Sequence, residues 1–172
     1  PTLSAHAIFT SFSAGGVIVT QPIVDLSLAP TARSYGGRAD MTGVAFAQPL
    51  NAAADLALAD NALALTNLDS RVGAMHARGA ATLAPAGASA QLTLSGRLDG
   101  LLPGVSGRVS GELALSPEAL ALDAQLADVR AGELRIRAAT FAANGPLDAI
   151  AARFDLRGRL RQAPLAFAGT AT

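Results

Sequence analysis

The side chains in this chain that could hold a metal ion or carry acid–base chemistry are few and scattered. His6 and His76 are the only histidines, and neither has a second ligand at a spacing that would bring it to the same ion. The carboxylates of Asp55 and Asp60, or of Asp123 and Asp128, are spread along polar faces, without the contrasting surroundings that a pair of catalytic carboxylates needs. We therefore predict ordinary solvated polar residues at these positions and no metal site.

Nucleophilic and phosphate-transfer chemistry is equally unsupported. No serine sits in a Gly-x-Ser-x-Gly motif, and the absence of cysteine excludes a thiolate site and disulfides. The segment Val105–Gly111 is rich in Gly and Ser, but it lacks the Gly-Lys-Ser/Thr that completes a phosphate-binding loop. We interpret this segment as a strand with glycines at positions of tight curvature. The sequence therefore predicts no enzyme and implies no cofactor.

The most evident pattern in the sequence is the alternation of residue types that is typical of β-strands, and it is far clearer than any catalytic motif. Along most of the chain an apolar residue alternates with a small or polar one. Ala90, Leu92 and Leu94 fall on one side of such a segment, while Gln91 and Thr93 fall on the other. Because side chains alternate across a β-strand, this spacing predicts a sheet with one apolar face and one polar face.

Turn signals divide these segments into short strands. Pro85-Ala86-Gly87 and Ser116-Pro117-Glu118 are examples, and such breaks recur roughly every 10 to 18 residues. Hydrophobic residues make up 51% of the chain but aromatic residues only 4%, which suits a thin, extended sheet better than a thick core. The prediction is an all-β fold: a long, curled, mainly antiparallel, groove-like β-sheet built from repeated strand units with little helix.

An internal repeat supports one continuous architecture. Three pairs of segments match in order: Leu58–Leu68 with Leu115–Leu126, Ala80–Leu83 with Ala138–Phe141, and Leu94–Leu98 with Leu156–Leu160. We predict that residues 1–172 form a single segment of a larger protein, with internal repeats over about 40–100 and 101–162. The drifting offset between matches is expected where small insertions lie in loops.

The charges exclude one class of partner. The chain has 13 basic residues, all arginine, and 13 acidic residues, so it lacks the positive excess that nucleic-acid binding requires. Four arginines share one strand face with Asp155: Arg153, Arg157, Arg159 and Arg161. They are either a basic stripe for anionic lipid headgroups or a partner, or the solvated side of the sheet. We favour the second interpretation, with Glu112, Glu133 and Asp155 as balancing carboxylates.

The opposite, apolar side needs a cover. It comprises Leu92, Leu94, Leu98, Val109, Leu113, Leu115, Leu120, Leu122, Leu126, Leu134, Ile136, Phe154, Leu156, Leu160, Leu165 and Phe167. One solution is a closed sandwich or barrel, in which the sheet folds on itself. The other is an open trough in which acyl chains form the cover, because soluble proteins rarely leave so large an apolar patch exposed.

Three stretches resemble a known superfamily. Leu113–Leu126, the Asn-Gly-Pro-Leu-Asp-Ala-Ile step at Asn144–Ile150, and Phe154–Leu160 are similar in style to the TamB/AsmA/YdbH superfamily of Gram-negative envelope proteins. The resemblance implies a periplasmic protein anchored in the inner membrane, whose curled sheets form a hydrophobic groove that conducts phospholipids between the two membranes. TamB relatives also work with an outer-membrane partner of the BamA type in outer-membrane protein assembly.

These observations lead to one function hypothesis and one alternative. The first is a segment of a periplasmic lipid-conducting groove that serves outer-membrane biogenesis. Its partners would be phospholipid acyl chains, neighbouring strand units of the same parent chain, and an outer-membrane protein of the BamA type. The alternative is a structural β-solenoid or sandwich segment of a surface or adhesin-like protein whose apolar core is sealed by itself. Whether the apolar face is closed discriminates between them.

Overall fold

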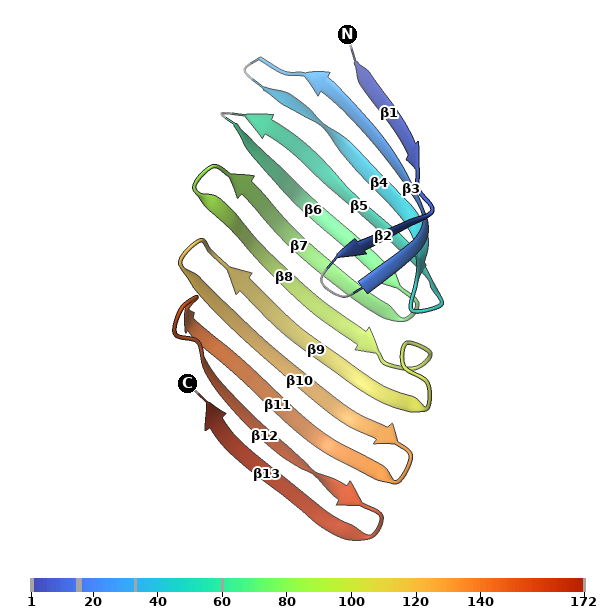
Figure 1. Cartoon of the computed structure of the whole chain (residues 1–172), viewed down its shortest axis with the longest axis vertical. Coiled ribbons are helices and arrows are strands. Elements are labelled where there is room, and N and C mark those ends of the chain that lie inside the picture. The colour runs from blue at the N-terminus through green and yellow to red at the C-terminus, as the bar shows by residue number, and fades with distance from the viewer. Residues whose placement is uncertain (1, 15–16, 33, 60, 172) are drawn as a thin grey trace.

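The computed structural model of the protein describes residues 2–14, 17–32, 34–59 and 61–171, which form a single β-sheet (Figure 1). The sheet contains thirteen strands within these residues, every pairing is antiparallel, and no helix is present among them. The first and last strands do not pair with each other, so the sheet stays open. The prediction of an all-β, curled antiparallel sheet is confirmed.

The strand order follows the chain order, with one exception. The strands are β1 (Leu3–Ile8), β2 (Ser11–Ala14), β3 (Val17–Pro30), β4 (Tyr35–Ala45), β5 (Gln48–Ala59), β6 (Ala62–Val72), β7 (Met75–Ala84), β8 (Gly87–Arg97), β9 (Val105–Leu115), β10 (Ala119–Ala131), β11 (Leu134–Pro146), β12 (Ala151–Leu160) and β13 (Ala163–Ala171). From β3 to β13 each strand pairs with the next, as short connections require. The exception is β2, which pairs with the start of β3, while β1 pairs with its later part.

The turns lie where the sequence places them. Pro85 and Ala86 connect β7 to β8, and Ser116, Pro117 and Glu118 connect β9 to β10. In the second turn the amide of Ala119 donates a hydrogen bond to Oγ of Ser116 at 3.0 Å. Such a side-chain bond closes a tight turn and fixes the register of the strands that follow it.

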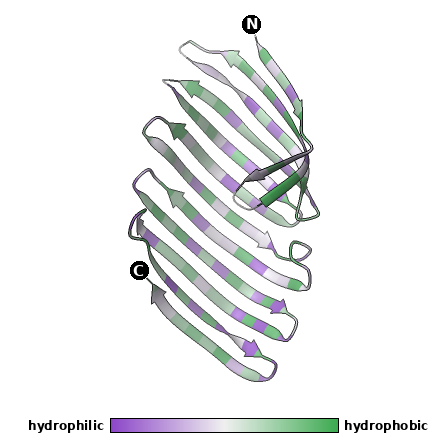
Figure 2. Cartoon of the chain, viewed as in Figure 1, coloured by the Kyte–Doolittle hydropathy of each residue, from purple (hydrophilic) through white to green (hydrophobic). Residues whose placement is uncertain are grey.

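The register divides the sheet into two faces of opposite character. Residues paired across antiparallel strands share a face, so Leu92, Leu113 and Leu122 form one row across β8, β9 and β10. The adjacent row, which includes Thr93 and Glu112, lies on the other side. We call these the apolar face and the polar face, and both continue along the sheet from strand to strand. Figure 2 shows hydrophobic positions recurring on every strand.

Bulges keep the two faces consistent where the alternation slips. Asn67 in β6 and Asp128 in β10 have positive φ values of 52° and 54°, and register shifts occur beside both. At Asp128 the extra residue returns Val129 to the face that Leu126 occupies. A bulge of this kind also bends a strand and increases its twist, which helps to curl the sheet.

A glycine in the predicted curved strand accommodates the β10 bulge. Gly107 lies opposite Val129, and a Cβ atom at Gly107 would be only 2.7 Å from Cγ2 of Val129. Only a residue without a side chain permits this approach. The interpretation of Val105–Gly111 as a strand with a glycine at a point of curvature is therefore confirmed.

The matched segments of the predicted repeat fall on equivalent strands. The first pair covers the turn into β6 and the turn into β10, the second lies on β7 and β11, and the third lies at the ends of β8 and β12. Both β6 and β10 contain a residue with positive φ, Asn67 and Asp128, although Asp128 lies nearer to the end of its strand. The sequence similarity thus recurs every four strands, while the boundaries 40–100 and 101–162 stay a prediction.

A small buried core forms where β3 bends. Figure 1 shows β2 and the start of β3 turned away from the direction of the other strands. At this bend Val19, Ala45 and Leu50 form a buried cluster, against which Met41 and Val72 pack. At this corner of the described sheet, other side chains of the protein pack over the apolar face.

Elsewhere the sheet is a single layer. Contacts between strands run between hydrogen-bonded neighbours, and no second sheet lies over β7–β13 in the described part of the chain. Large apolar side chains remain exposed there, with Leu83 at 60%, Leu160 at 51% and Phe167 at 63% of their possible surface. Val129, Ile136 and Ala143 are buried on this face, but the described residues leave most of it without a cover.

We expect Leu50→Ala and Leu83→Ala to differ sharply in their effect on stability. Leu50 is only 6% exposed, so its truncation leaves a cavity and should lower the free energy of unfolding by roughly 2–5 kcal/mol. The same change at exposed Leu83 should cost less than about 1 kcal/mol. Urea unfolding followed by circular dichroism measures both. Equal losses would contradict the assignment of the core to the β3 corner.

Candidate functional site: the apolar face

The predicted apolar residues come together on one side of the sheet. Across β8–β13 the register pairs Leu115 with Leu120, Val109 with Leu126, Leu134 with Leu160, and Leu156 with Phe167. Leu98, which follows the end of β8, is the predicted face residue that lies outside a strand. Ile136 is buried, and the other predicted face residues are half-buried or exposed. The geometry is thus that of a broad surface and not of a pocket.

This face is also free of charge. Outside the bulges, the register rows of β3–β13 place no Asp, Glu or Arg on the apolar face among the residues that the structure describes. Its polar side chains are sparse, such as Gln48 and Ser70, and Gln48 donates a hydrogen bond to the carbonyl of Gly100 at 3.1 Å. A surface of this composition offers dispersion and burial, with few polar groups to hold a ligand in one pose.

The aromatic content of the face is concentrated near its last strand. Phe154 on β12 and Phe167 on β13 stack, with ring centroids 5.1 Å apart and an interplanar angle of 20°. Phe154 reaches over Gly169, where a Cβ atom would collide with its ring. The small neighbour lets the two rings lie together at the exposed end of an otherwise aliphatic face.

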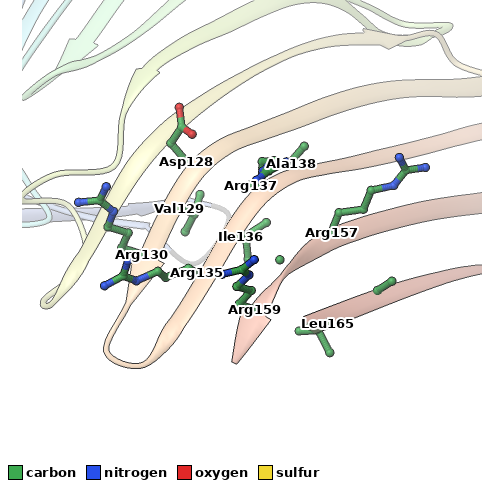
Figure 3. Close-up of a pocket in the computed structure, with 12 residues that line it drawn as sticks. Asp128, Val129, Arg130, Arg135, Ile136, Arg137, Ala138, Arg157, Arg159 and Leu165 are labelled. Atoms are coloured by element: carbon green, nitrogen blue, oxygen red, sulfur yellow. The ribbon is translucent and has the colours of Figure 1, made fainter. Parts of the chain in front are cut away.

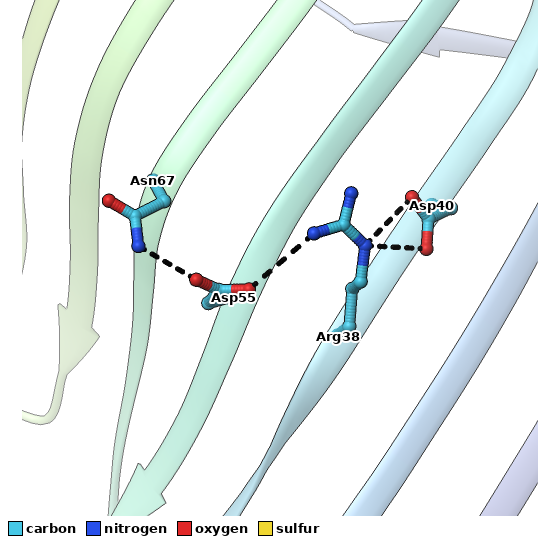
Figure 4. Close-up of polar contacts among 4 residues, drawn as sticks. All are labelled: Arg38, Asp40, Asp55 and Asn67. Carbon is cyan, nitrogen blue, oxygen red and sulfur yellow. Dashed lines mark hydrogen bonds and ion pairs between the residues drawn. The ribbon is translucent and has the colours of Figure 1, made fainter.

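The polar face carries ion pairs that cross the strands. Arg38 lies 3.1 Å from Asp40 and 3.8 Å from Asp55, and Asn67 donates a hydrogen bond to Asp55 at 2.7 Å (Figure 4). These groups belong to β4, β5 and β6 and are solvent-exposed. Exposed pairs of this kind contribute little to stability, so their main effect is to keep this face hydrated.

Both histidines are ordinary members of this polar face. His6 lies 2.6 Å from Asp25, and His76 lies 2.9 Å from Asp69, to which Arg78 also donates at 3.2 Å. The hydrogen bond from His76 is the largest influence that lowers the pKa of Asp69. Within the described ranges, no three His, Asp or Glu side chains converge on a point where a metal ion could bind.

The expected balance of charge among the C-terminal arginines is only partly correct. Asp155 pairs with Arg157 at 3.3 Å and Glu133 pairs with Arg161 at 2.6 Å. Glu112, however, lies opposite Thr93 and Asp123 and pairs with no described arginine. Asp128 pairs instead with Arg108, at 2.5 Å.

The sequence interpretation missed the N-terminal half of the apolar face. Val24, Leu26, Leu56, Leu65 and Met75 continue the same face across β3–β7. Their alternation is interrupted by the bulges, and two polar residues stand together at Thr66–Asn67 where one is expected. Reading such doublets as bulges, and not as the end of a strand, would have extended the predicted face.

The two outer strands leave hydrogen-bonding edges free. Among the described strands, β1 pairs on one side only with β3, and β13 pairs on one side only with β12. The sequence of β13, Ala163–Ala171, contains no charged residue, and Pro164 near its start is the one residue that discourages a further strand. Both edges are therefore suited to pairing with additional strands of the predicted neighbouring units.

Comparisons with known proteins identify no relative. No protein-family model, no curated protein and no solved structure matches this chain. The similarity to the TamB/AsmA/YdbH superfamily consequently stays a prediction from the sequence.

The described residues include no helix long and apolar enough to cross a bilayer.

We expect His76→Ala to raise the pKa of Asp69 toward the usual aspartate value of 3.8, because the change removes the hydrogen bond that lowers it most. With the pKa lowered in the folded protein, the stabilising contribution of Asp69 is present above pH 3.8 and is lost as the pH falls through the lowered value. NMR titration of the Asp69 carboxyl carbon measures the shift. His6→Ala is the control and should leave the titration of Asp69 unchanged.

Proposed function

We propose that this chain is a segment of a periplasmic hydrophobic groove that binds phospholipid acyl chains along its apolar face and conducts them between the inner and outer membranes. The observation that carries the proposal is the uncharged apolar face, which continues from β3 to β13 and, beyond the β3 corner, lacks a second layer among the described residues. A face of this extent needs an apolar partner.

Acyl chains fit this face in chemistry and in shape. Burial stabilises by about 25 cal/mol per Å² of apolar surface, so a single lipid tail lying along the sheet gains a useful binding free energy without hydrogen bonds. The strands of β8–β13 are nine to thirteen residues long, which corresponds to a sheet roughly 30–40 Å across. That width accommodates an extended tail in any orientation on the face.

The register supports movement as well as binding. The row through Leu92, Leu113, Leu122 and Ala143 crosses successive strands, and it therefore runs along the length of the sheet. Neighbouring rows are likewise made of Leu, Val, Ala and Gly, with a few larger residues. Because consecutive positions along a row present similar chemistry, a tail that moves by one strand loses and regains similar contacts. Small differences in free energy between positions favour sliding over storage.

Partners and location follow from the resemblance and from the open edges. Additional strand units of the same parent chain would pair with β1 and β13 and extend the groove in both directions. The similarity to TamB-like proteins supports a periplasmic location, a parent protein anchored in the inner membrane, and cooperation with an outer-membrane protein of the BamA type in outer-membrane biogenesis.

We expect Leu122→Asp to weaken phospholipid binding at least tenfold, because a carboxylate in the middle of the apolar face must lose hydration whenever a tail covers it. Gln125→Asp is the matched control, since Gln125 lies on the polar face of the same strand, and it should bind lipid as the original chain does. Native mass spectrometry of protein purified from a Gram-negative host, combined with displacement of a fluorescent fatty acid, measures both.

Two results would contradict the proposal. One is a stable monomer that carries no lipid and takes up none, which would favour a structural segment whose apolar face is sealed by other parts of its parent protein. The other is an equal loss of binding in the two variants, which would place the lipid away from the apolar face.

A further inference from the structure

Three arginines stand directly opposite one another on the polar face. Arg130 of β10 pairs in register with Arg135 of β11, which pairs in turn with Arg159 of β12. We call these three residues the arginine row. Arg157, two residues before Arg159, and Arg137, beside the β10 bulge, lie next to the row (Figure 3).

The arginine row is left without carboxylate partners. On β4–β9 every described arginine lies within 4.0 Å of a carboxylate. Among the described residues no such contact exists for Arg130, Arg135 or Arg159. The nearby carboxylates already pair elsewhere: Asp128 with Arg108, Asp155 with Arg157, and Glu133 with Arg161.

This arrangement is unfavourable for the isolated sheet. Like charges directly opposite on neighbouring antiparallel strands repel and destabilise the pairing. On β4–β9 the polar face avoids such unpaired arginines by placing an aspartate or glutamate within reach of each described arginine. A concentrated positive charge that the chain itself leaves unbalanced is well suited to an external anion.

The same residues surround a hollow large enough for such an anion. Its volume is about 710 Å³, and its lining includes the arginine row, Arg137, Arg157, the carboxylate residue Asp128 and the apolar residues Val129, Ile136 and Leu165. Register places Ala138 and Ala166 on either side of Arg157, on the polar face. Alanine side chains are short, so these two neighbours take up little of the space beside Arg157.

We propose that this hollow binds a phosphate-bearing anion. The planar guanidinium group donates two parallel hydrogen bonds to phosphate oxygens, and several arginines around one site match the several oxygens of a phosphate group. The bound anion would also remove the repulsion within the arginine row. The side chains of the arginine row lie on the face opposite the proposed acyl surface, so anion binding by them stands independently of lipid-tail binding.

The phosphate group that binds belongs either to a phospholipid headgroup or to a free phosphate compound. In the first case the polar face near the β10–β11 and β12–β13 turns would touch an anionic membrane surface. In the second it would hold a soluble ligand. The two are separated by comparing inorganic phosphate with vesicles of phosphatidylcholine that contain or lack phosphatidic acid.

The test is titration of the isotopically labelled full chain with inorganic phosphate at constant ionic strength, with the arginine Nε–H resonances followed by NMR. We expect saturable shifts at the arginine row, and at least tenfold weaker binding in the double variant Arg135→Gln/Arg159→Gln. The control Arg38→Gln/Arg78→Gln removes the same charge from arginines that already have carboxylate partners, and it should bind normally.

A second measurement guards against loss of folding in the variant. Since the double change relieves repulsion, it should raise the unfolding temperature in phosphate-free buffer, whereas phosphate should raise that of the original chain alone. Vesicle binding that depends on phosphatidic acid and on the arginine row would identify a headgroup as the source, and saturable binding of free phosphate alone would identify a soluble ligand. Absence of both, or equal weakening in the control variant, would overturn the proposal.

Discussion

The hydrogen-bonded pairing of neighbouring antiparallel strands is the interaction on which everything else in this molecule depends. Among the described residues it satisfies the backbone from β3 to β13, and beyond the β3 corner it does so without a second layer. A domain that folds in this way does not need to bury both faces, and its side chains are sorted by register alone. The result is a charge-free apolar face and a hydrated polar face whose contrast continues along the sheet. Lipid-tail binding is proposed for the first face and anion binding for the second, and both depend on that separation.

Small residues and bulges allow this sorting to persist in a curled sheet. Where the alternation would place an apolar residue on the wrong side, a residue with positive φ such as Asp128 restores it. Where strands curve closely, glycine removes the side chain that would obstruct its neighbour, as Gly107 does beneath Val129. The high alanine and glycine content thus has a geometric reason. Alanine has a high helix propensity, but the alternating pattern of apolar and polar residues outweighs this propensity and produces strands.

Much of the architecture was predictable from the sequence, because alternation and turn residues act locally. The strands around Leu92 and Leu122, the turn at Ser116–Glu118 and the antiparallel order of neighbouring strands all follow from such signals, which left open whether the apolar face is closed. The buried corner at Val19, where β3 bends, depends on contacts distant in sequence, so alternation did not reveal it. The arginine row was not predicted from the sequence for a similar reason. Arg130, Arg135 and Arg159 become neighbours only once the register of three strands is fixed.

The central claim is that the apolar face meets lipid tails while the opposite face does not. Photocrosslinking tests it most directly, with a photoreactive amino acid placed at Leu113 or at its neighbour Glu112, which lie on opposite faces of β9. In Gram-negative envelopes we expect phospholipid adducts, detected by mass spectrometry, from position 113 and few or none from position 112. Lipid adducts of equal yield at both positions, or crosslinks from position 113 to protein alone, would contradict it.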